Sequence, residues 1–234
     1  MKKLLVTLNI NDYDKEITGL TFPYMKEYAQ NIGADFHIIT ERKFPNFSIT
    51  LEKFQLYEIS EKYDKIIFLD ADCIINPKTK DLTTLVDRER ILISGFNPPD
   101  HHFYHKNING EHSLKYYAPF YFLVFSKETR NCVKPYSDIV NYYQYINLNS
   151  SYPDMKKYMS LRTHLTDKIN KETLLDEFFL TLNIHKYDIK CASLTEDFSE
   201  LSAISHASDS KENKIKHLKK AIKQIKSINS ISYS

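Results

Sequence analysis

The sequence predicts an α/β fold with a mostly parallel central sheet flanked by helices, and three observations support this. First, short apolar runs alternate with longer segments whose apolar residues recur at helical spacing. Second, a run of four apolar residues, 66–69, leads directly into two carboxylates, Asp70 and Asp72. Third, the chain has 234 residues, which is enough for a sizeable core in one domain of this class.

The first part of the chain has a β-α-β-α-β order, which implies parallel strands joined by right-handed crossovers. Apolar runs bounded by polar residues predict strands at 3–9, 35–40, 65–70 and 90–95. Apolar residues three and four positions apart predict helices at 21–32 and 51–62. We therefore expect the centre of the sheet to come from this half.

The second half of the chain is less regular. Two turn signals, Pro98-Pro99 and Asn109-Gly110, predict a long loop over residues 96–119. A His-x-x-x-His spacing lies within this loop, where we do not expect it to bind zinc. The remaining patterns predict, in order, a strand at 120–125, helices at 127–147 and 171–185, and a strand at 186–192.

Residues 211–226 are expected to form a basic amphipathic helix. Its apolar stripe is surrounded by lysines and consists of Ile215, Leu218, Ile222 and Ile225. Two interpretations are open. The helix lies on an anionic membrane surface as a peripheral contact, or its stripe packs against the domain and its lysines are solvated. Residues 227–234 are expected to be a frayed tail.

The composition limits the compartment and the classes of partner. A net charge of +2 argues against a nucleic-acid partner. Only four glycines are present and no Gly-rich phosphate loop, so a metal ion and lysines would have to hold any bound phosphate. The three cysteines are widely spaced, which suits a reducing compartment. The N-terminal apolar run is too short for a signal peptide, and we expect a cytoplasmic protein.

The two carboxylates that follow the apolar run are the strongest functional signal. In open α/β folds ligands bind at the sheet edge where parallel strands end. Alternate strand residues share a face, so Asp70 and Asp72 can converge on one cation. Mn²⁺ or Mg²⁺ favours such oxygen ligands together with phosphate oxygens. The alternative is an acidic pair that only caps a turn, but two adjacent carboxylates would then repel each other without a cation.

Three runs of residues resemble the nucleotide-sugar-binding half of GT-A-fold glycosyltransferases: Leu51-Glu52-Lys53-Phe54-Gln55-Leu56-Tyr57-Glu58, Tyr63-Asp64-Lys65 and Phe68-Leu69-Asp70-Ala71-Asp72. In particular they resemble glycosyltransferase family 8, the glycogenin/galactosyltransferase-like group. The resemblance is dense over residues 1–95 and sparser, but in the same order, to about residue 220.

This resemblance implies a fold, an activity and a division of the chain. The fold would be GT-A-like, with a single catalytic domain at 1–210 made of a nucleotide-binding half (1–95) and an acceptor-side half (96–210). The activity would be metal-dependent transfer of a sugar from a nucleoside-diphosphate sugar, in this family usually a UDP-sugar. The acceptor would be a hydroxyl on a glycan or glycolipid, and the stereochemistry retaining.

The resemblance also implies metal ligands. Asp70 and Asp72 would hold Mn²⁺ or Mg²⁺ against the donor diphosphate. The family's third ligand is a His near the end of the domain, often within His-x-x-Gly-x-x-Lys-Pro-Trp, and His206 occupies that place. The Gly, Pro and Trp of that motif are missing here, and the alternative for His206 is an ordinary loop histidine.

Donor binding is implied at eight positions: Thr7, Leu8, Asn9, Tyr13, Lys53, Asp70, Ala71 and Lys211. The end of the first strand would line the nucleoside pocket, with Tyr13 stacking on the base. Lys53 would face the nucleotide sugar, unless it is a solvated helix lysine. Lys211 would contact phosphate, with Lys214 as the alternative.

Asp176 and Glu177 are implied as the catalytic pair, because the family places an Asp-Gln or Asp-Glu pair at the start of a helix facing the donor sugar or acceptor. They could orient the acceptor hydroxyl or, in an inverting enzyme, remove its proton. The alternative is an acidic pair on the helix surface. One departure concerns the strand at 120–125, which lacks the Asn and Gly of the family's Tyr-Phe-Asn-x-Gly motif.

Two other functions are compatible with an Asp-x-Asp after a buried strand. A haloacid-dehalogenase-like phosphohydrolase would use Asp70 as its nucleophile, but that class has Gly-Thr or Val-Thr after the second Asp, where this chain has Cys73-Ile74-Ile75. A non-catalytic nucleotide-sugar-binding module on the same fold is the other alternative.

Overall fold

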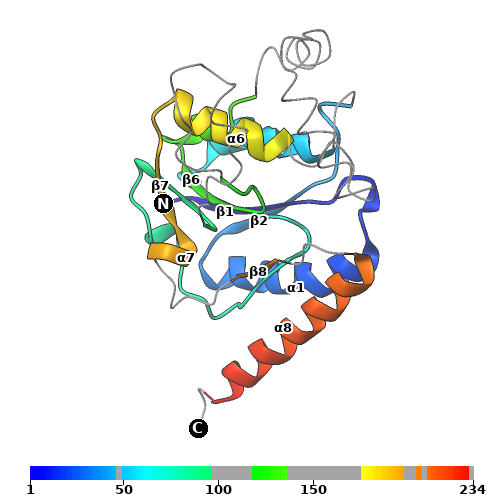
Figure 1. The fold of residues 1–234 in the computed structure, drawn as a ribbon. Coiled ribbons are helices and arrows are strands. Elements are labelled where there is room, and N and C mark those ends of the chain that lie inside the picture. The colour runs from blue at the N-terminus through cyan, green and yellow to red at the C-terminus, as the bar shows by residue number, and fades with distance from the viewer. Residues whose placement is uncertain (46–48, 96–117, 136–174, 198–203, 207–209, 232–234) are drawn as a thin grey trace.

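A computed structural model describes residues 1–45, 49–95, 118–135, 175–197, 204–206 and 210–231. A central sheet separates two layers of helices (Figure 1). Helix α6 (Leu175–Lys186) covers one face, and α1 (Lys15–Asn31) covers the other, with α8 (Lys211–Ile231) outside α1. This three-layer arrangement is the predicted α/β fold.

The central sheet has six strands in the order β2-β1-β3-β6-β5-β7. Their bounds are β1 Lys3–Leu8, β2 Asp35–Ile39, β3 Lys65–Leu69, β5 Arg90–Ile93, β6 Phe122–Ser126 and β7 Lys190–Ser193. β1 is parallel to both β2 and β3, and β5 is parallel to β7. β6 is antiparallel to its two neighbours, so it alone among these strands is reversed. The sheet is therefore mostly parallel, as predicted.

A second, two-stranded sheet joins distant parts of the chain. β4 (Cys73–Ile75) follows the Asp-x-Asp turn and pairs antiparallel with β8 (Ile204–His206). The register places Cys73 opposite His206. This short ribbon brings a residue from the end of the chain to the edge of the central sheet.

Helix α1 begins earlier than the predicted residue 21. Asp14 is its N-cap, and the Asp14 carboxylate accepts hydrogen bonds from the backbone N–H groups of Glu16 and Ile17. The helix contains Pro23 and ends at Asn31, close to the predicted stop. An Asp at this position satisfies N–H groups that have no partner within the helix, which explains the early start.

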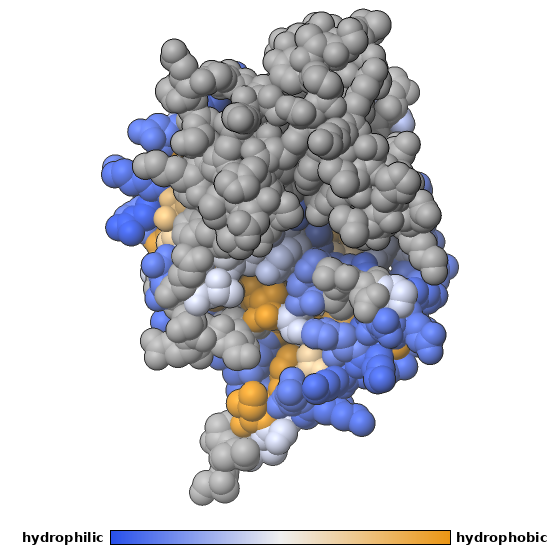
Figure 2. Space-filling model, in the orientation of Figure 1, coloured by the Kyte–Doolittle hydropathy of each residue, from blue (hydrophilic) through white to orange (hydrophobic). Residues whose placement is uncertain are grey.

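Helix α8 also differs from its predicted bounds, because it continues to Ile231 instead of ending at 226. Its apolar stripe packs against α1 and β4, in a cluster that includes Leu218, Ala221, Ile17 and Ile74. Figure 2 shows mostly hydrophilic side chains over this lower part of the molecule, with an apolar patch near the end of α8. The stripe therefore packs on the domain, and only the lysine face is left for the predicted membrane contact.

Several other predictions are corrected within the described residues. The expected helix at 51–62 is three short helical segments, η2 (Ile49–Gln55), α2 (Leu56–Ile59) and η3 (Ser60–Lys62). Instead of an α-helix from 127, the described residues to 135 hold a short 3-10 helix, η5 (Arg130–Val133). Further short helices are η1 (Ile10–Asp12), η4 (Leu82–Thr84) and α7 (Leu194–Asp197).

Two predicted segments lie outside the described residues, namely most of the 96–119 loop with its histidines and the greater part of the 127–147 helix. The strand expected at 186–192 begins at Lys190, because α6 continues to Lys186. Among the described helices, none combines the length and apolar character that crossing a membrane requires.

The core consists of two apolar layers, one on each face of the sheet. β3 is buried along its whole length and contributes to both layers. Ile66 and Phe68 pack toward α6, while Ile67 and Leu69 pack toward α1. A strand buried on both faces needs apolar residues at every position, which is why this run is continuous in the sequence.

Candidate functional site

The turn between β3 and β4 carries the Asp-x-Asp pair and is held from both sides. The backbone N–H of Asp70 donates to the carbonyl of Tyr121 at 2.9 Å, and the Thr21 hydroxyl donates to the carbonyl of Ala71 at 2.6 Å. Within the turn, the N–H of Cys73 donates to the Asp70 carbonyl at 2.9 Å. The sheet and α1 therefore fix the backbone from which both carboxylates project.

Asp70 belongs to a group that we call the inner cluster, made of the buried Lys53 and Asp176 and the partly buried Asp70. The Lys53 Nζ lies 2.9 Å from Asp70 Oδ2 and 2.8 Å from Asp176 Oδ2. It also donates to the carbonyl of Phe120 at 2.6 Å. Lys53 is only 5% exposed and Asp176 only 1%, so neither is the solvated side chain that the sequence left open.

The charges of the inner cluster depend on one another. Burial lowers the pKa of Lys53, but the carboxylates of Asp176 and Asp70 outweigh it and raise that pKa well above its ordinary value. Burial raises the pKa of Asp70, and the charges of Asp72 and Asp176 add to this, while Lys53 opposes it. One lysine is therefore shared by two carboxylates, and an additional cation near Asp70 would stabilise its charged form.

Asp72 belongs to a second group, the outer cluster, made of Tyr13, Asp72, His206 and Lys214. The Lys214 Nζ lies 2.5 Å from Asp72 Oδ2, and the His206 Nε2 lies 3.5 Å from Asp72 Oδ1. The Tyr13 hydroxyl accepts a hydrogen bond from Lys214 at 3.1 Å. The His206 ring stacks on Tyr121, with centroids 4.1 Å apart.

The outer cluster favours a negatively charged Asp72. Burial raises the pKa of Asp72, but the hydrogen bond to His206 and the charge of Lys214 outweigh it, and the pKa falls below its ordinary value. Burial lowers the pKa of Lys214, whereas Asp72 raises it, and the net shift is upward. The ammonium group of Lys214 therefore occupies the carboxylate of Asp72, which the sequence analysis assigned to a metal.

The residues around Asp72 fit a divalent cation. Ligand atoms of Asp72, Cys73 and His206 lie within 4.8 Å of one another. A carboxylate and an imidazole suit Mn²⁺, and Asp70, two positions before Asp72, offers another carboxylate. The two carboxylates of the motif bind different lysines, so an ion held by both would have to compete with Lys214, Lys53 or both.

The residues predicted to line the nucleoside pocket lie at the carboxyl end of β1. Thr7 and Leu8 end the strand, and the N–H of Asn9 donates to the Ile39 carbonyl at 2.8 Å. Thr7 Oγ1 and Asn9 Oδ1 are buried and have no hydrogen-bond partner among the described residues. Buried polar atoms usually have a hydrogen-bond partner. A bound ligand could therefore supply the partner that these two atoms lack. Tyr13 is 48% exposed, which leaves its ring accessible for stacking.

Two predicted site residues stand apart from the clusters. The Lys211 Nζ lies 2.7 Å from Asp14 Oδ2, at the start of α1, and it is the later residue Lys214 that reaches Asp72. Glu177 is partly buried, and its Oε1 accepts the N–H of Phe120 at 3.4 Å. Asp176 has one oxygen on Lys53, and its Oδ1 is buried without a partner in the described part of the chain.

Sequence reasoning missed two contributors, Tyr121 and Cys73. Tyr121 was read as the interior of a strand, but β6 begins one residue later, and Tyr121 both anchors Asp70 and stacks on His206. Cys73 was noted as one of three widely spaced cysteines, whereas the β4–β8 pairing places it opposite His206. A three-residue strand such as β8 has no periodicity that would have revealed this pairing.

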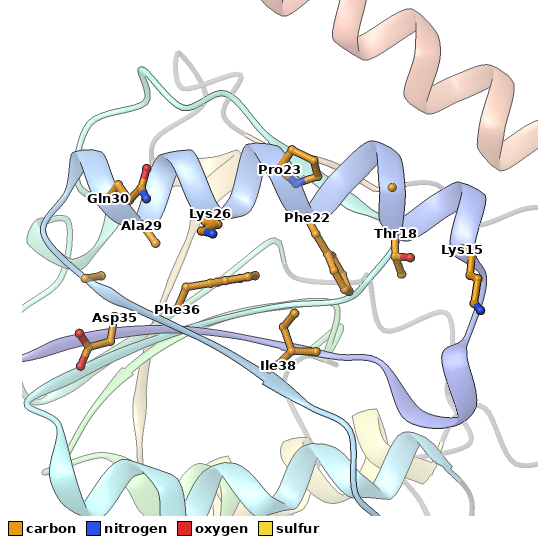
Figure 3. A pocket seen from close by; sticks show the side chains of 12 residues that line it. Lys15, Thr18, Phe22, Pro23, Lys26, Ala29, Gln30, Asp35, Phe36 and Ile38 are labelled. Carbon is orange, nitrogen blue, oxygen red and sulfur yellow. The ribbon is translucent and has the colours of Figure 1, made fainter.

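A groove of about 1000 Å³ lies elsewhere, between α1 and the edge strand β2. Figure 3 shows Phe22, Phe36 and Ile38 along it, with Lys15 and Lys26 beside them. None of the residues of the inner and outer clusters lines this groove. Size alone does not make it the functional site, because the converging carboxylates and lysines lie elsewhere.

Comparison with known proteins identifies the class of fold. No protein-family model matches the chain, and a search of curated proteins finds no match. Solved structures do match, and glycosyltransferases of the GT-A type are among them. The chain therefore has the GT-A fold that the sequence predicted. This fold does not support the haloacid-dehalogenase alternative.

Two of these structures show the extent of the likeness. A glycosyltransferase involved in the glycosylation of the major capsid of PBCV-1 matches with a TM-score of 0.51 and 12% identity, over 94% of this chain and 99% of that one. The galactosyltransferase LgtC, in complex with donor and acceptor sugar analogs, matches with a TM-score of 0.50 and 11% identity, over 96% and 95%. At these identities the likeness establishes the fold alone.

Proposed function

We propose that the protein is a metal-dependent glycosyltransferase that transfers a sugar from a nucleoside-diphosphate sugar, most simply a UDP-sugar, to a hydroxyl on a glycan or glycolipid. One observation carries this proposal. The end of β3 brings Asp70 and Asp72 beside two lysines, one histidine and one further buried carboxylate, on a GT-A fold. Retention of stereochemistry follows from the family resemblance only.

The outer cluster is the proposed binding place for the donor diphosphate. Asp70, Asp72 and His206 would hold Mn²⁺ or Mg²⁺, and the bound ion would act as a Lewis acid that stabilises charge on the leaving diphosphate. Lys214 would turn from Asp72 to the diphosphate, since its ammonium group is already within reach of this place. Lys214, instead of Lys211, is therefore the proposed phosphate contact.

The inner cluster is the proposed place for the transferred sugar. Lys53 fixes one oxygen of Asp176, so the position of Oδ1, which has no partner among the described residues, is fixed as well. That oxygen can accept a hydrogen bond from a sugar hydroxyl without a change of rotamer. We assign Asp176 to orienting the donor or acceptor, with Glu177 next to it on α6. The nucleoside would use Thr7 Oγ1 and Asn9 Oδ1, which have no hydrogen-bond partner in the described part of the chain, with the Tyr13 ring on the base.

The test is thermal stability with UDP, GDP and their sugars, each with and without Mn²⁺. A ligand that binds only the folded state should add about 2.7 kcal/mol at a hundred times its Kd. We expect a stabilisation by one nucleotide series that requires Mn²⁺ or Mg²⁺ and is lost in Asp72→Asn. Asp87→Asn is the matched control, because Asp87 is exposed and pairs with Arg90. No stabilisation by any nucleotide with either ion would refute the proposal.

The non-catalytic module needs a separate measurement. Release of the nucleoside diphosphate from the stabilising donor, measured with and without oligosaccharide acceptors, distinguishes an enzyme from a binding protein. Asp176→Asn should bind the donor and lose turnover, because it keeps the shape of the side chain but alters the group next to the sugar. Binding without turnover in the unmodified protein would favour the module. The cytoplasmic location and a peripheral contact through the lysines of α8 remain predictions.

A further inference from the structure

Cys73 occupies a position that sugar transfer does not explain. It begins β4 and lies directly opposite His206 of β8 in antiparallel register. Side chains of directly opposed residues project from the same face of a ribbon, with Cβ atoms about 4.5–5.5 Å apart. The strand pairing therefore places the Cys73 thiol next to the His206 imidazole, and Asp72 immediately precedes Cys73 in the chain.

The three side chains form a compact set of ligand atoms. An oxygen of Asp72, the Sγ of Cys73 and a ring nitrogen of His206 lie within 4.8 Å of one another. Cys73 is fully buried and is not in a disulfide. Its hydrogen bond is a weak one, to the Tyr121 carbonyl at 3.5 Å. Little would therefore be lost if the sulfur exchanged this contact for a bond to an ion.

We propose that Asp72, Cys73 and His206 form a site for a soft or borderline divalent ion of the Zn²⁺ class, bound in the absence of nucleotide. The proposal rests on the proposed function in that Asp72 and His206 serve both ions. Zinc takes Cys, His and carboxylate ligands and keeps a fourth position for water when three come from the protein. As the bond from sulfur to the ion forms, the thiol proton passes to solvent.

Ligand chemistry would decide which ion occupies this part of the molecule. With a nucleotide bound, phosphate oxygens favour a hard ion such as Mn²⁺ or Mg²⁺. Without nucleotide, the thiolate and imidazole favour Zn²⁺, which also stands above Mn²⁺ in general affinity. Because both ions need Asp72, zinc would compete with the hard ion and would also have to displace Lys214. Zinc is therefore expected to inhibit donor binding.

Cobalt titration of the full chain without nucleotide tests the site, because a thiolate bound to Co²⁺ gives an intense sulfur-to-metal absorption. We expect this absorption to saturate at one equivalent and to be removed by one equivalent of Zn²⁺. Cys73→Ser and Cys73→Ala should both lose it, with folding checked by circular dichroism. His206→Ala should weaken Co²⁺ binding while the sulfur band persists at high Co²⁺.

The matched control is Cys132→Ser, since Cys132 is an equally buried free cysteine on a different element. It should keep the full absorption. Absence of the band in the unmodified protein, or its loss in Cys132→Ser instead of the Cys73 variants, would overturn the inference. The outcome is independent of sugar transfer, because the band is read without nucleotide, whereas donor binding is read with Mn²⁺, which gives no such band.

Discussion

The inner and outer clusters each pair one carboxylate of the Asp-x-Asp motif with a lysine, but in different surroundings. In the inner cluster, Lys53 is buried and shares its charge between Asp70 and Asp176. Its members come from the sheet and from the helical layer on one face of it. In the outer cluster, Asp72 meets residues contributed by β8 and α8, which come from the end of the chain.

The difference teaches that one short motif performs two tasks. Asp70 is part of a charge network in which one buried lysine serves two carboxylates, so loss of Lys53 leaves both carboxylates without a countercharge. Asp72 instead pairs with the ammonium group of Lys214, which reaches it from α8, and with His206, whose ring stacks on Tyr121. We expect the cation on Asp72 to be exchangeable. We therefore expect the inner cluster to determine stability and the outer cluster to determine ion and phosphate binding.

The largest effect is expected for Lys53→Met, which removes the shared ammonium and leaves the buried Asp176 and the partly buried Asp70 without a countercharge. Breaking a buried ion pair from one side costs about 3–5 kcal/mol, and here two carboxylates lose their partner. The measurement is the free energy of unfolding in urea, read by circular dichroism.

Lys65→Met is the matched control, because Lys65 is also buried but its Nζ donates to the backbone carbonyls of Val86 and Asp87. Its loss leaves neutral acceptors unpaired, at about 1–3 kcal/mol. Burial also lowers the pKa of Lys65, in contrast to the raised pKa of Lys53. Equal costs for the two substitutions would contradict the idea that stranded carboxylates dominate at Lys53.

The next largest effect is expected for Leu218→Ala, which tests whether α8 holds the outer cluster in place. Leu218 lies on α8, is fully buried and packs against Ile17 of α1 and Ile74 of β4. Removing a buried Leu side chain costs about 2–4 kcal/mol, including the cavity that remains. We expect lower stability and weaker Mn²⁺-dependent nucleotide binding in the same variant.

Ile228→Ala serves as the control for the α8 substitution, because Ile228 lies on the same helix but is 58% exposed. Exposed substitutions of this kind stay within about 0.5 kcal/mol. If Leu218→Ala lowered stability but left nucleotide binding unchanged, α8 would support the fold without positioning Lys214.

The sequence allowed much of the fold to be predicted, for a physical reason. β1, β3 and β6 are buried on both faces and therefore consist of nearly continuous apolar runs. The start of α1 was missed because its first turns lie outside the central sheet, where Ile17 packs on α8 and on the short strand β4. The apolar periodicity that revealed the helix begins only at the residues that face the sheet.

The site could be predicted only where its residues are local. Asp70 and Asp72 follow a recognisable strand, but their partners are fixed by contacts across 17 positions for Lys53 and 142 positions for Lys214. The choice between Lys211 and Lys214 depends on the rotation of α8 about its axis, which its packing on α1 sets. The sequence of α8 does not determine this rotation, because its lysines are spread over several faces of the helix.

A smaller effect is expected for Lys214→Met, which removes the ammonium that competes with a divalent ion for Asp72. We expect several-fold tighter Mn²⁺ binding to the nucleotide-free protein, because the carboxylate no longer has to exchange partners. Binding of the nucleoside diphosphate should weaken at the same time, since a phosphate contact is lost. Electron paramagnetic resonance of free Mn²⁺ measures the first, and calorimetry the second.

Lys211→Met is the control for that comparison, as it removes a lysine of the same helix that pairs with Asp14 instead of Asp72. It should leave Mn²⁺ binding unchanged. Weaker Mn²⁺ binding in Lys214→Met would show that Lys214 supports the ion and does not compete with it. The cation on Asp72 would then not be exchangeable, and the contrast between the outer and inner clusters would fail.

The smallest effect is expected at Asp14, which caps α1 and accepts a hydrogen bond from Lys211. That hydrogen bond, with those from the N–H groups of Ile17 and Glu16, holds the pKa of Asp14 below its ordinary value of 3.8. A carboxyl whose pKa is lower in the folded state adds stability above its unfolded pKa and loses it as the pH falls through the folded value.

The acid side of the melting-temperature profile should therefore be slightly less steep in Asp14→Asn than in the unmodified protein. Lys211→Met should lie between the two, because the cap remains while the countercharge is gone. Identical acid profiles for all three proteins would mean that the start of α1 is held by its packing on α8 alone, and that the outer cluster depends on no charge beyond its own members.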